Sequence, residues 1–219
     1  MNTLILVPTQ LEADKLQLEP SCEESRFEIA VCGFGPVGSA ISTCLLIERH
    51  RPDRVVLAGI AGALQETAEI GRAFAFRSVT MHGIGVVRDG QLRSPVELGF
   101  SELPVLSKTK EKLKDRLIGL QTSDRIPSLP QLLTVCASSD RFDTATERHK
   151  LYPAASAEDM EGYAVALACA AMGVPLMIIR GISNRAGEAD RSRWQIEKSL
   201  KQTHAAILQA VAADDWGVK

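Results

Sequence analysis

Residues 157–187 limit the possible folds of this chain more than any other stretch. They read AEDMEGYAVALACAAMGVPLMIIRGISNRAG, the pattern of an acidic turn, a helix, a tight turn, a strand and a polar loop. The alanine-rich run from about Tyr163 to Met172 favours a helix, and Gly173 stands where helices commonly end. The apolar run Leu176–Ile179 is short enough to be a strand buried on both faces. The stretch therefore predicts an α/β fold.

Polar residues follow this predicted strand. Arg180 ends the apolar run, and Ser183-Asn184-Arg185 comes soon after it. Ligands of open α/β sheets bind outside the carboxyl ends of strands, so these residues are site candidates, as is Glu161 at the helix start. The alternative is that the acids of residues 158–161 only complement the helix dipole. Arg180 would then pair with a surface carboxylate, and Asn184 would be a turn residue.

Composition excludes several kinds of partner. The chain has 219 residues, and 45% of them are hydrophobic, enough for a sizeable core. Its 25 basic and 27 acidic residues are well mixed and give a net charge of −2. No basic stripe indicates nucleic-acid binding, and no apolar run reaches the length of a membrane span. We therefore expect neither a nucleic acid nor a membrane as partner.

The cysteines indicate a reducing compartment. They lie at positions 22, 32, 44, 136 and 169, mostly in apolar runs, and no two have Cys-x-x-Cys spacing. We interpret them as reduced core residues without zinc or disulfides. The first residues also lack the basic segment of a secretory signal. The expectation is a soluble, cytoplasmic protein.

A further candidate carboxylate follows the first predicted strand, Leu4–Val7. Glu12 lies in a predicted helix start just after Pro8-Thr9. It is either another acid that complements a helix N-terminus or a carboxylate at the carboxyl end of a strand, facing the site.

A glycine-rich turn follows the second predicted strand, Phe27–Val31. Residues 33–38 match the Gly-x-Gly-x-x-Gly pattern of dinucleotide-binding folds, and Asp53 follows about twenty residues later. We reject that interpretation because Asp53 precedes the next strand, Val55–Leu57, instead of closing it. The first βα unit of the chain is also a different one. We assign the turn to backbone packing, or to the architecture of the site or of a dimer.

The remaining chain predicts several elements. Small residues at 58–63 allow a ligand, or another element, to approach the backbone closely. A long loop over residues 83–104 is of the kind that often carries function. We also expect a strand from Ile70 to Val79, a solvated helix face over Lys108–Arg116, a strand over Leu132–Ala137 and a closing helix over Arg191–Val211.

Taken together, Met160-Glu161 and the later Arg180-Gly-Ile-Ser183-Asn184 resemble the nucleoside phosphorylase/nucleosidase superfamily. Its members carry a Met-Glu ribose clamp and an Arg-x-x-Ser-Asp/Asn base site. The resemblance implies a three-layer αβα sandwich with a central mixed, partly barrel-like sheet, in one domain over residues 1–219. It also implies a purine nucleoside as ligand, no metal ion or cofactor, and a homodimer or higher homo-oligomer.

The resemblance assigns catalytic roles to four residues. Glu12 matches the glutamate that activates the attacking water, and Glu161 would accept hydrogen bonds from the ribose hydroxyls. Arg180 would hold the water or Glu161, and Asn184 would read the purine.

It also assigns residues that bind the substrate. Met160 would pack on the ribose, and Gly59-Ile60-Ala61 match a signature that lines the ribose pocket. Many methylthioadenosine nucleosidases have serine where this chain has Ile60. Phe142 would stack on the purine or pack in the core, and Asp143 follows where the family reads the base edge with main-chain groups.

Asn184 indicates which kind of purine the substrate carries. Adenine-cleaving relatives usually carry aspartate here, whereas an amide can accept from N7–H and donate to a 6-oxo group. Leu98-Gly99-Phe100 and Trp194-Gln195-Ile196 resemble the futalosine hydrolase branch, which releases hypoxanthine in a menaquinone pathway. Three alternatives stay open: a methylthioadenosine/S-adenosylhomocysteine nucleosidase, a purine nucleoside phosphorylase, and a nucleoside-binding module without catalysis.

Overall fold

The computed structural model describes residues 1–18, 27–95, 97–100 and 117–217. Cys22 and the helix expected over Lys108–Arg116 lie outside these residues. The strands are β1 (Thr3–Val7), β2 (Phe27–Val31), β3 (Arg54–Ala63), β4 (Ala73–His82), β5 (Val86–Arg88), β6 (Gln91–Arg93), β7 (Ile118–Gly119), β8 (Ser128–Val135), β9 (Ala155–Asp159) and β10 (Leu176–Arg185). The helices are α1 (Gln10–Leu16), α2 (Gly35–His50), α3 (Phe142–Leu151), α4 (Gly162–Met172) and α5 (Ile196–Val211), with a 3₁₀ turn at Arg191–Arg193.

The central sheet is mixed and closes partly on itself. Its strands have the order β10-β4-β8-β9-β3-β1-β2, and β10 also pairs with β3. These pairings join β3, β9, β8, β4 and β10 into a ring, from which β1 and β2 extend. β10 and β1 run parallel to β3, whereas β9 runs antiparallel to it. The predicted mixed, partly barrel-like sheet is therefore confirmed.

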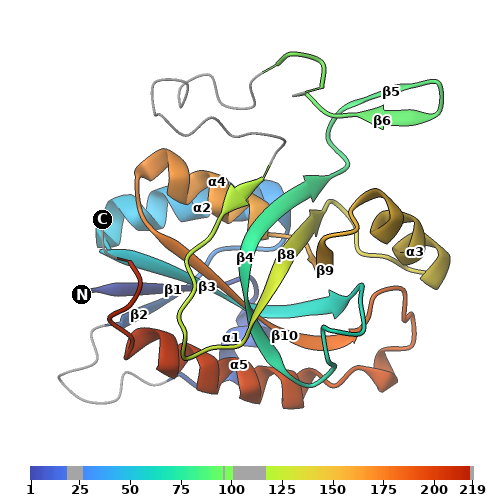
Figure 1. Ribbon diagram of the computed structural model, residues 1–219. Coiled ribbons are helices and arrows are strands. Elements are labelled where there is room, and N and C mark those ends of the chain that lie inside the picture. Colours follow the sequence, from blue (N-terminus) through green and yellow to red (C-terminus); the bar gives the residue numbers. More distant parts are fainter. Residues whose placement is uncertain (19–26, 96, 101–116, 218–219) are drawn as a thin grey trace.

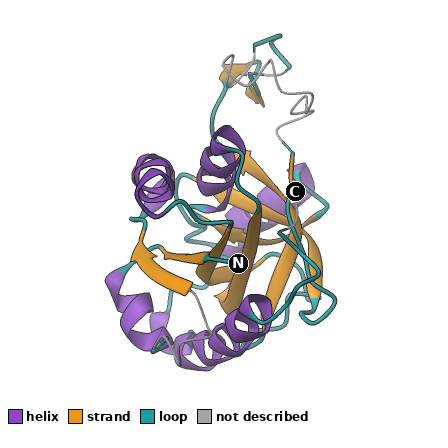
Figure 2. Ribbon diagram, turned by 90° about the vertical axis from the view of Figure 1, so that its left-hand side faces the viewer, coloured by secondary structure: helices purple, strands orange, loops and turns teal. Residues whose placement is uncertain are grey.

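Helices cover both faces of the sheet. Figure 1 shows α2 and α4 side by side on one face and α5 with α1 on the other, and Figure 2 shows the same layers from the side. Neighbouring residues of β3 point to opposite faces. Leu57 belongs to the core that includes Val165 of α4, and Val56 belongs to the core that includes Ile207 of α5. Two apolar layers thus hold the three-layer αβα sandwich together.

The acidic turn and the end of strand β10 differ from the prediction. Glu158 and Asp159 end strand β9 instead of forming a turn, whereas helix α4 begins at Gly162, close to the predicted start near Tyr163. Strand β10 continues beyond Arg180 to Arg185. The cause is long-range pairing, since residues 180–185 pair in parallel register with residues 59–63 of β3. Backbone hydrogen bonds to β3 thus extend β10 past its apolar run.

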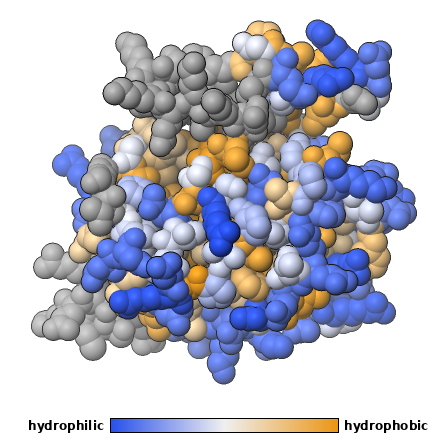
Figure 3. All heavy atoms as spheres, in the orientation of Figure 1, coloured by the Kyte–Doolittle hydropathy of each residue, from blue (hydrophilic) through white to orange (hydrophobic). Residues whose placement is uncertain are grey.

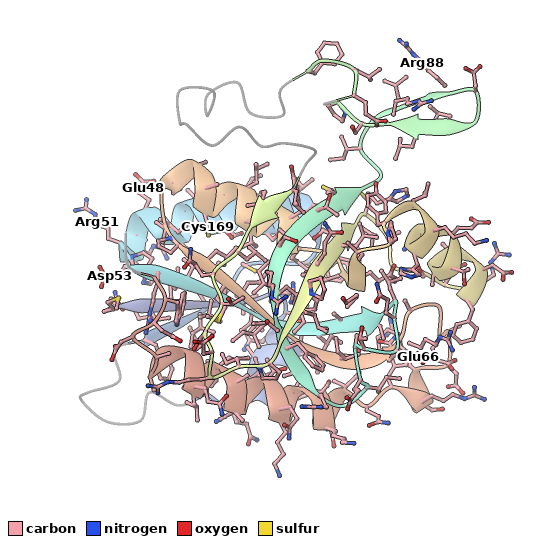
Figure 4. All side chains as sticks on the ribbon, viewed as in Figure 1. Glu48, Arg51, Asp53, Glu66, Arg88 and Cys169 are labelled. Atoms are coloured by element: carbon pink, nitrogen blue, oxygen red, sulfur yellow. The ribbon has the colours of Figure 1, made fainter. Side chains whose placement is uncertain are left out.

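The expected loop 83–104 contains a short hairpin. Strands β5 and β6 pair with each other and stand apart from the central sheet. Figure 1 shows the hairpin projecting beyond the end of β4, and Figure 4 labels Arg88 there. Figure 3 shows hydrophilic side chains over much of this face of the molecule. Within the described part of the chain, no helix combines the length and apolarity that a membrane crossing requires.

Candidate active site

A cavity of about 370 Å³ lies at the carboxyl ends of β1, β3 and β10. This volume is in the range of small-molecule sites. Apolar side chains from several elements line it, including Leu11, Phe34, Ile60, Met160 and Ile196. Its charged and amide side chains include Glu12, Glu158, Asp159, Glu161 and Asn184. The carboxyl ends of these strands, where the sequence predicts a site, therefore border a cavity.

Arg180 lies fully buried beside this cavity and holds two carboxylates. Its Nη2 atom donates to Asp159 Oδ2 at 2.5 Å and to Glu161 Oε2 at 3.2 Å, and its Nε atom donates to Asp159 Oδ2 at 3.1 Å. Thr134 Oγ1 donates to the other oxygen of Asp159 at 2.7 Å. Burial lowers the pKa of Arg180, but the charges of Asp159 and Glu161 raise it above its ordinary value. Arg180 therefore stays a cation at the centre of the cluster.

One nitrogen of the Arg180 guanidinium has no hydrogen-bond partner among the described residues. This atom, Nη1, is buried. A β-carbon placed on Gly59 would contact this Nη1 atom and would lie 2.8 Å from Glu12 Oε1. The free donor and the Glu12 carboxylate therefore flank the same point of the backbone. An unpaired buried donor is costly, so Arg180 retains one unsatisfied donor behind the cavity wall at Gly59.

Glu161 is held at the start of a helix. The backbone N–H of Gly35, the first residue of α2, donates to Glu161 Oε1 at 3.0 Å. A carboxylate is stabilised at a helix N-terminus. Burial nevertheless raises the pKa of Glu161 to about 7, against the opposing effects of Arg180 and the Gly35 N–H. The carboxyl group therefore changes its charge near neutral pH.

Glu12 is fixed by the turn that begins α1. Thr9 is the N-cap of this helix; its Oγ1 accepts from the Glu12 N–H at 3.2 Å and donates to Glu12 Oε2 at 2.7 Å. The N–H of Ile60 donates to Glu12 Oε1 at 3.1 Å. Both oxygens are thus oriented, and each keeps a lone pair for a further donor.

Asn184 follows an irregularity in strand β10. The register of β10 against β3 shifts between Ile182 and Asn184, so Ser183 is an extra residue of the kind found in β-bulges near active sites. Ser183 Oγ donates to Asn184 Oδ1 at 2.7 Å, and Asn184 Nδ2 donates to the Arg185 carbonyl at 2.9 Å. The amide keeps one N–H and one lone pair for a ligand.

The sequence model of the Phosphorylase superfamily matches residues 23–213. The chain belongs to this superfamily.

Its relatives include several nucleosidases. The chain is 30% identical over 185 residues to the 5′-methylthioadenosine/S-adenosylhomocysteine nucleosidase of Hydrogenovibrio crunogenus, covering 80% of this chain and 75% of that protein. It is 29% identical over 191 residues to the Staphylococcus aureus enzyme of the same name, covering 84% of this chain and 79% of that enzyme. The predicted family is confirmed, and so is the enzyme class at family level, an N-glycosidic-bond hydrolase.

Solved structures share the fold. A Colwellia psychrerythraea nucleosidase of the same name, in complex with adenine, has a TM-score of 0.76 at 19% identity, with 96% of this chain and 94% of that chain covered. The Helicobacter pylori futalosine hydrolase has a TM-score of 0.74 at 17% identity, with 96% and 97% covered. Since identities this low indicate only the fold, they do not choose between the two enzyme names.

In this superfamily member, the structure brings together most of the residues that the sequence singled out. The cavity wall contains Glu12, Ile60, Ala61, Met160, Glu161 and Asn184. Arg180 and Gly59 are directly paired in the β10–β3 register and contribute from behind the wall.

Phe142 and Asp143 are not brought into the cavity wall. They begin helix α3, and Phe142 is 48% exposed, with the Arg185 guanidinium 5.6 Å from the centre of its ring. The loop before them supplies Ser138 and Ser139 to the wall instead. The stacking role of Phe142 and the base-edge role at Asp143 thus stay predictions from the family resemblance.

The sequence reasoning missed Asp159 as a site residue. Its carboxylate fixes Arg180 and also accepts from the N–H of Gly162 at 2.9 Å. A signal was present, because an arginine at the end of a fully buried strand needs a buried carboxylate as partner. Glu161 was assigned to the site, and its neighbour Asp159 was read only as a helix-start acid.

The glycine-rich turn at residues 33–38 serves Glu161 through the Gly35 N–H. Asp53, the acid of the rejected dinucleotide interpretation, is exposed and accepts from the N–H of Asn2 at 2.6 Å. Figure 4 shows Asp53 at the edge of the molecule. Over the described ranges, no group of three or more histidine, cysteine or acidic residues is arranged to hold a metal ion.

Proposed function

We propose that this chain hydrolyses the N-glycosidic bond of a 6-oxopurine nucleoside, and that futalosine is its substrate. The products would be hypoxanthine and dehypoxanthine futalosine, as in the futalosine pathway of menaquinone biosynthesis. The observation that carries the proposal is Asn184, a neutral amide in the same cavity as Glu12 and Glu161.

Cleavage of this bond develops positive charge on the ribose and needs a water on one face of the sugar. Glu12 is the base for that water, since Thr9 and Ile60 orient its two oxygens and leave lone pairs free. Arg180, whose buried Nη1 atom lies close to the same part of the Gly59 backbone, would hold Glu161 through Nη2 or help to fix the water. A positioned base of this kind contributes about 10² to 10⁴ in rate.

Glu161 acts on the sugar. Its ionised carboxylate accepts from ribose hydroxyls and stabilises the developing cation, an effect that is large in a site closed to water. The Gly35 N–H and Arg180 hold it in place. Met160, the neighbouring residue in the cavity wall, supplies the apolar surface under the ribose.

Asn184 acts on the departing base. Its free N–H donates to the 6-oxo group, and its remaining lone pair accepts from N7–H. A site that hydrogen-bonds a substrate group rejects analogues that leave its polar atoms unpaired.

The names of the relatives support a second candidate, a 5′-methylthioadenosine/S-adenosylhomocysteine nucleosidase. The same Glu12, Arg180 and Glu161 would serve that reaction, and only the reading of the base differs. A phosphorylase activity is less well supported, because Glu12, Asp159 and Glu161 make this part of the cavity unfavourable for a phosphate anion.

The proposal extends to a homodimer or higher homo-oligomer. Helix α2 exposes Val37, Ile41 and Leu45, each four residues apart, next to exposed Phe34 at the cavity. Residues with this spacing share one helix face, and a contiguous apolar face is typical of an interaction surface. The buried thiols of Cys32 and Cys169 support a reducing, cytoplasmic location.

Product analysis tests the proposal. The purified protein is incubated with futalosine in phosphate-free buffer and in buffer with phosphate. We expect equal rates of hypoxanthine release and a free sugar product in both. Release that depends on phosphate, with a sugar 1-phosphate as product, would move the chain to the phosphorylases.

A further inference from the structure

Glu158 is a buried carboxylate in the cavity wall that the proposed reaction does not use. It is only 4% exposed. Its Oε1 accepts from the Ser139 N–H at 2.6 Å, and its Oε2 accepts from Ser139 Oγ at 2.9 Å and Arg148 Nη1 at 2.9 Å. Three donors therefore orient Glu158 as a hydrogen-bond acceptor, and Oε1 keeps a lone pair.

The sheet register places Glu158 across from Asn184. Gly62 of β3 pairs with Asn184 of β10 on one side and with Glu158 of β9 on the other. Two strand spacings separate the α-carbons of Asn184 and Glu158, roughly 9 to 10 Å. All three residues line the cavity, and Gly62 between them has no side chain. A flat base in the cavity would therefore lie between an amide and a carboxylate, next to Gly62 and to Ala186, whose Cα atom is 3.3 Å from the position of an added β-carbon on Gly62.

These two groups differ in what they can distinguish. The amide of Asn184 is held by Ser183 and Arg185, so it presents one N–H to the 6-oxo group and one lone pair to N7–H. A carboxylate only accepts. A 6-oxopurine carries a hydrogen on N1, next to the 6-position, whereas a 6-aminopurine has a lone pair there.

We propose that Glu158 is a specificity-determining residue that accepts a hydrogen bond from N1–H of a 6-oxopurine while Asn184 binds the 6-oxo and N7 side. The inference rests on the proposed function and deepens it, because it adds a second contact that selects the same class of base. A 6-aminopurine would place its N1 lone pair against the carboxylate oxygen and leave that buried acceptor unsatisfied, which is costly.

Arg148 and Ser139 are positioning residues for this contact. The side chain of Arg148 in α3 binds Glu158, Ser139 Oγ and the Ala137 carbonyl at 2.8 to 2.9 Å. It thereby ties the loop after β8 to the end of β9. A purely structural role of Glu158 would be to hold this loop, and it would affect both kinds of base alike.

Free-base binding separates the two roles. Dissociation constants of hypoxanthine and adenine are measured by titration calorimetry for the wild type, Glu158→Gln and Ser139→Ala. We expect Glu158→Gln to lower the preference for hypoxanthine over adenine at least tenfold. Ser139→Ala keeps the carboxylate, so it should weaken both bases by similar factors. A preference within twofold of the wild type in folded Glu158→Gln would overturn the inference.

A second variant covers the case in which Glu158→Gln does not fold. Removing one charge of a buried pair leaves the other uncompensated, so Glu158→Gln is combined with Arg148→Met, and the same tenfold loss of preference is expected.

The outcomes for the two proposals are distinguishable. An unchanged preference together with phosphate-independent futalosine cleavage would leave the proposed function standing without Glu158. A tenfold shift in base preference without any nucleoside cleavage would remove the proposed function and keep the assignment of Glu158.

Discussion

Gly59 lies directly opposite Arg180 in the parallel pairing of β3 and β10, and the Arg180 guanidinium occupies the space that a side chain on Gly59 would fill. The same space borders Glu12 Oε1, 2.8 Å from an added β-carbon. The absence of a side chain at Gly59 thus leaves room for the Arg180 guanidinium and for the Glu12 carboxylate at the same part of the backbone.

The Gly59→Ala variant should be nearly inactive although it folds. The added methyl group displaces Arg180 or Glu12, and a shift of about 1 Å at a reacting centre can cost about 10² in rate. We expect kcat to fall by about that factor. The matched control is Gly38→Ala in α2, where an added β-carbon meets no atom within 4 Å. Equal activity of the two variants would show that the Gly59 contact does not matter.

The Glu12→Gln variant should bind substrate but not turn it over. A glutamine amide keeps the size of the side chain and cannot take a proton from water. We expect kcat to fall by at least about 10², with the dissociation constant for nucleoside changed by less than tenfold. Asp14→Asn on the same helix, which alters a carboxylate that accepts from Gln10, is the control. Turnover near the wild-type rate would remove Glu12 from the mechanism.

The activity should depend on the ionisation of Glu161. Since burial raises its pKa to about 7, the reactive carboxylate is lost as pH falls through 7, and kcat/KM should decline towards tenfold per pH unit below it. A carboxyl group with the ordinary pKa of 4.5 would keep kcat/KM constant down to about pH 5.5. Measurement of kcat/KM from pH 5 to 8, on protein that circular dichroism finds folded, decides between them.

The raised pKa of Glu161 also has a consequence for the stability of the protein. A carboxyl group whose pKa is higher in the folded state contributes fully below the unfolded-state pKa, and this contribution is lost as pH rises through the folded-state pKa. The free energy of unfolding of the wild type should therefore decrease relative to Glu161→Gln between about pH 4.5 and 7. A difference that does not vary with pH in this window would contradict the raised pKa.

The family and fold class were predicted from the resemblance that short motifs carry, and the same motifs named many of the residues that line the candidate cavity. The strand at residues 155–159 was not predicted from the sequence. Ala-Ser-Ala-Glu-Asp contains no β-branched or aromatic residue, so nothing local favours a strand. It forms because β8 and β3 offer backbone partners on both sides.

The same reason explains why Glu158 and Asp159 were misread. At a helix start both would be exposed acids, whereas in β9 Glu158 pairs with the partly buried Arg148 and Asp159 with the fully buried Arg180. Such contacts join residues that are far apart in the sequence or on other elements. The hydrogen-bond networks, and with them the separation of roles between Glu158 and Asp159, appear only when the strands are placed.

The Asn184→Asp variant should shift the base preference. The carboxylate offers only acceptors, faces the Arg185 carbonyl that Asn184 Nδ2 now binds, and repels a 6-oxo group. We expect the ratio of kcat/KM for 6-oxopurine over 6-aminopurine nucleosides to fall at least about tenfold, or roughly 1.4 kcal/mol. If both kinds of substrate lose activity equally, Asn184 does not read the 6-position.

The most direct measurement of the central claim is the initial rate of free-base release from futalosine, inosine and 5′-methylthioadenosine, each at the same low concentration without phosphate. At concentrations below KM these rates compare kcat/KM. The account predicts release of hypoxanthine from futalosine at a rate at least about tenfold above the release of adenine from 5′-methylthioadenosine. Faster release of adenine would contradict it and would make the chain a methylthioadenosine nucleosidase that carries an asparagine at its base site.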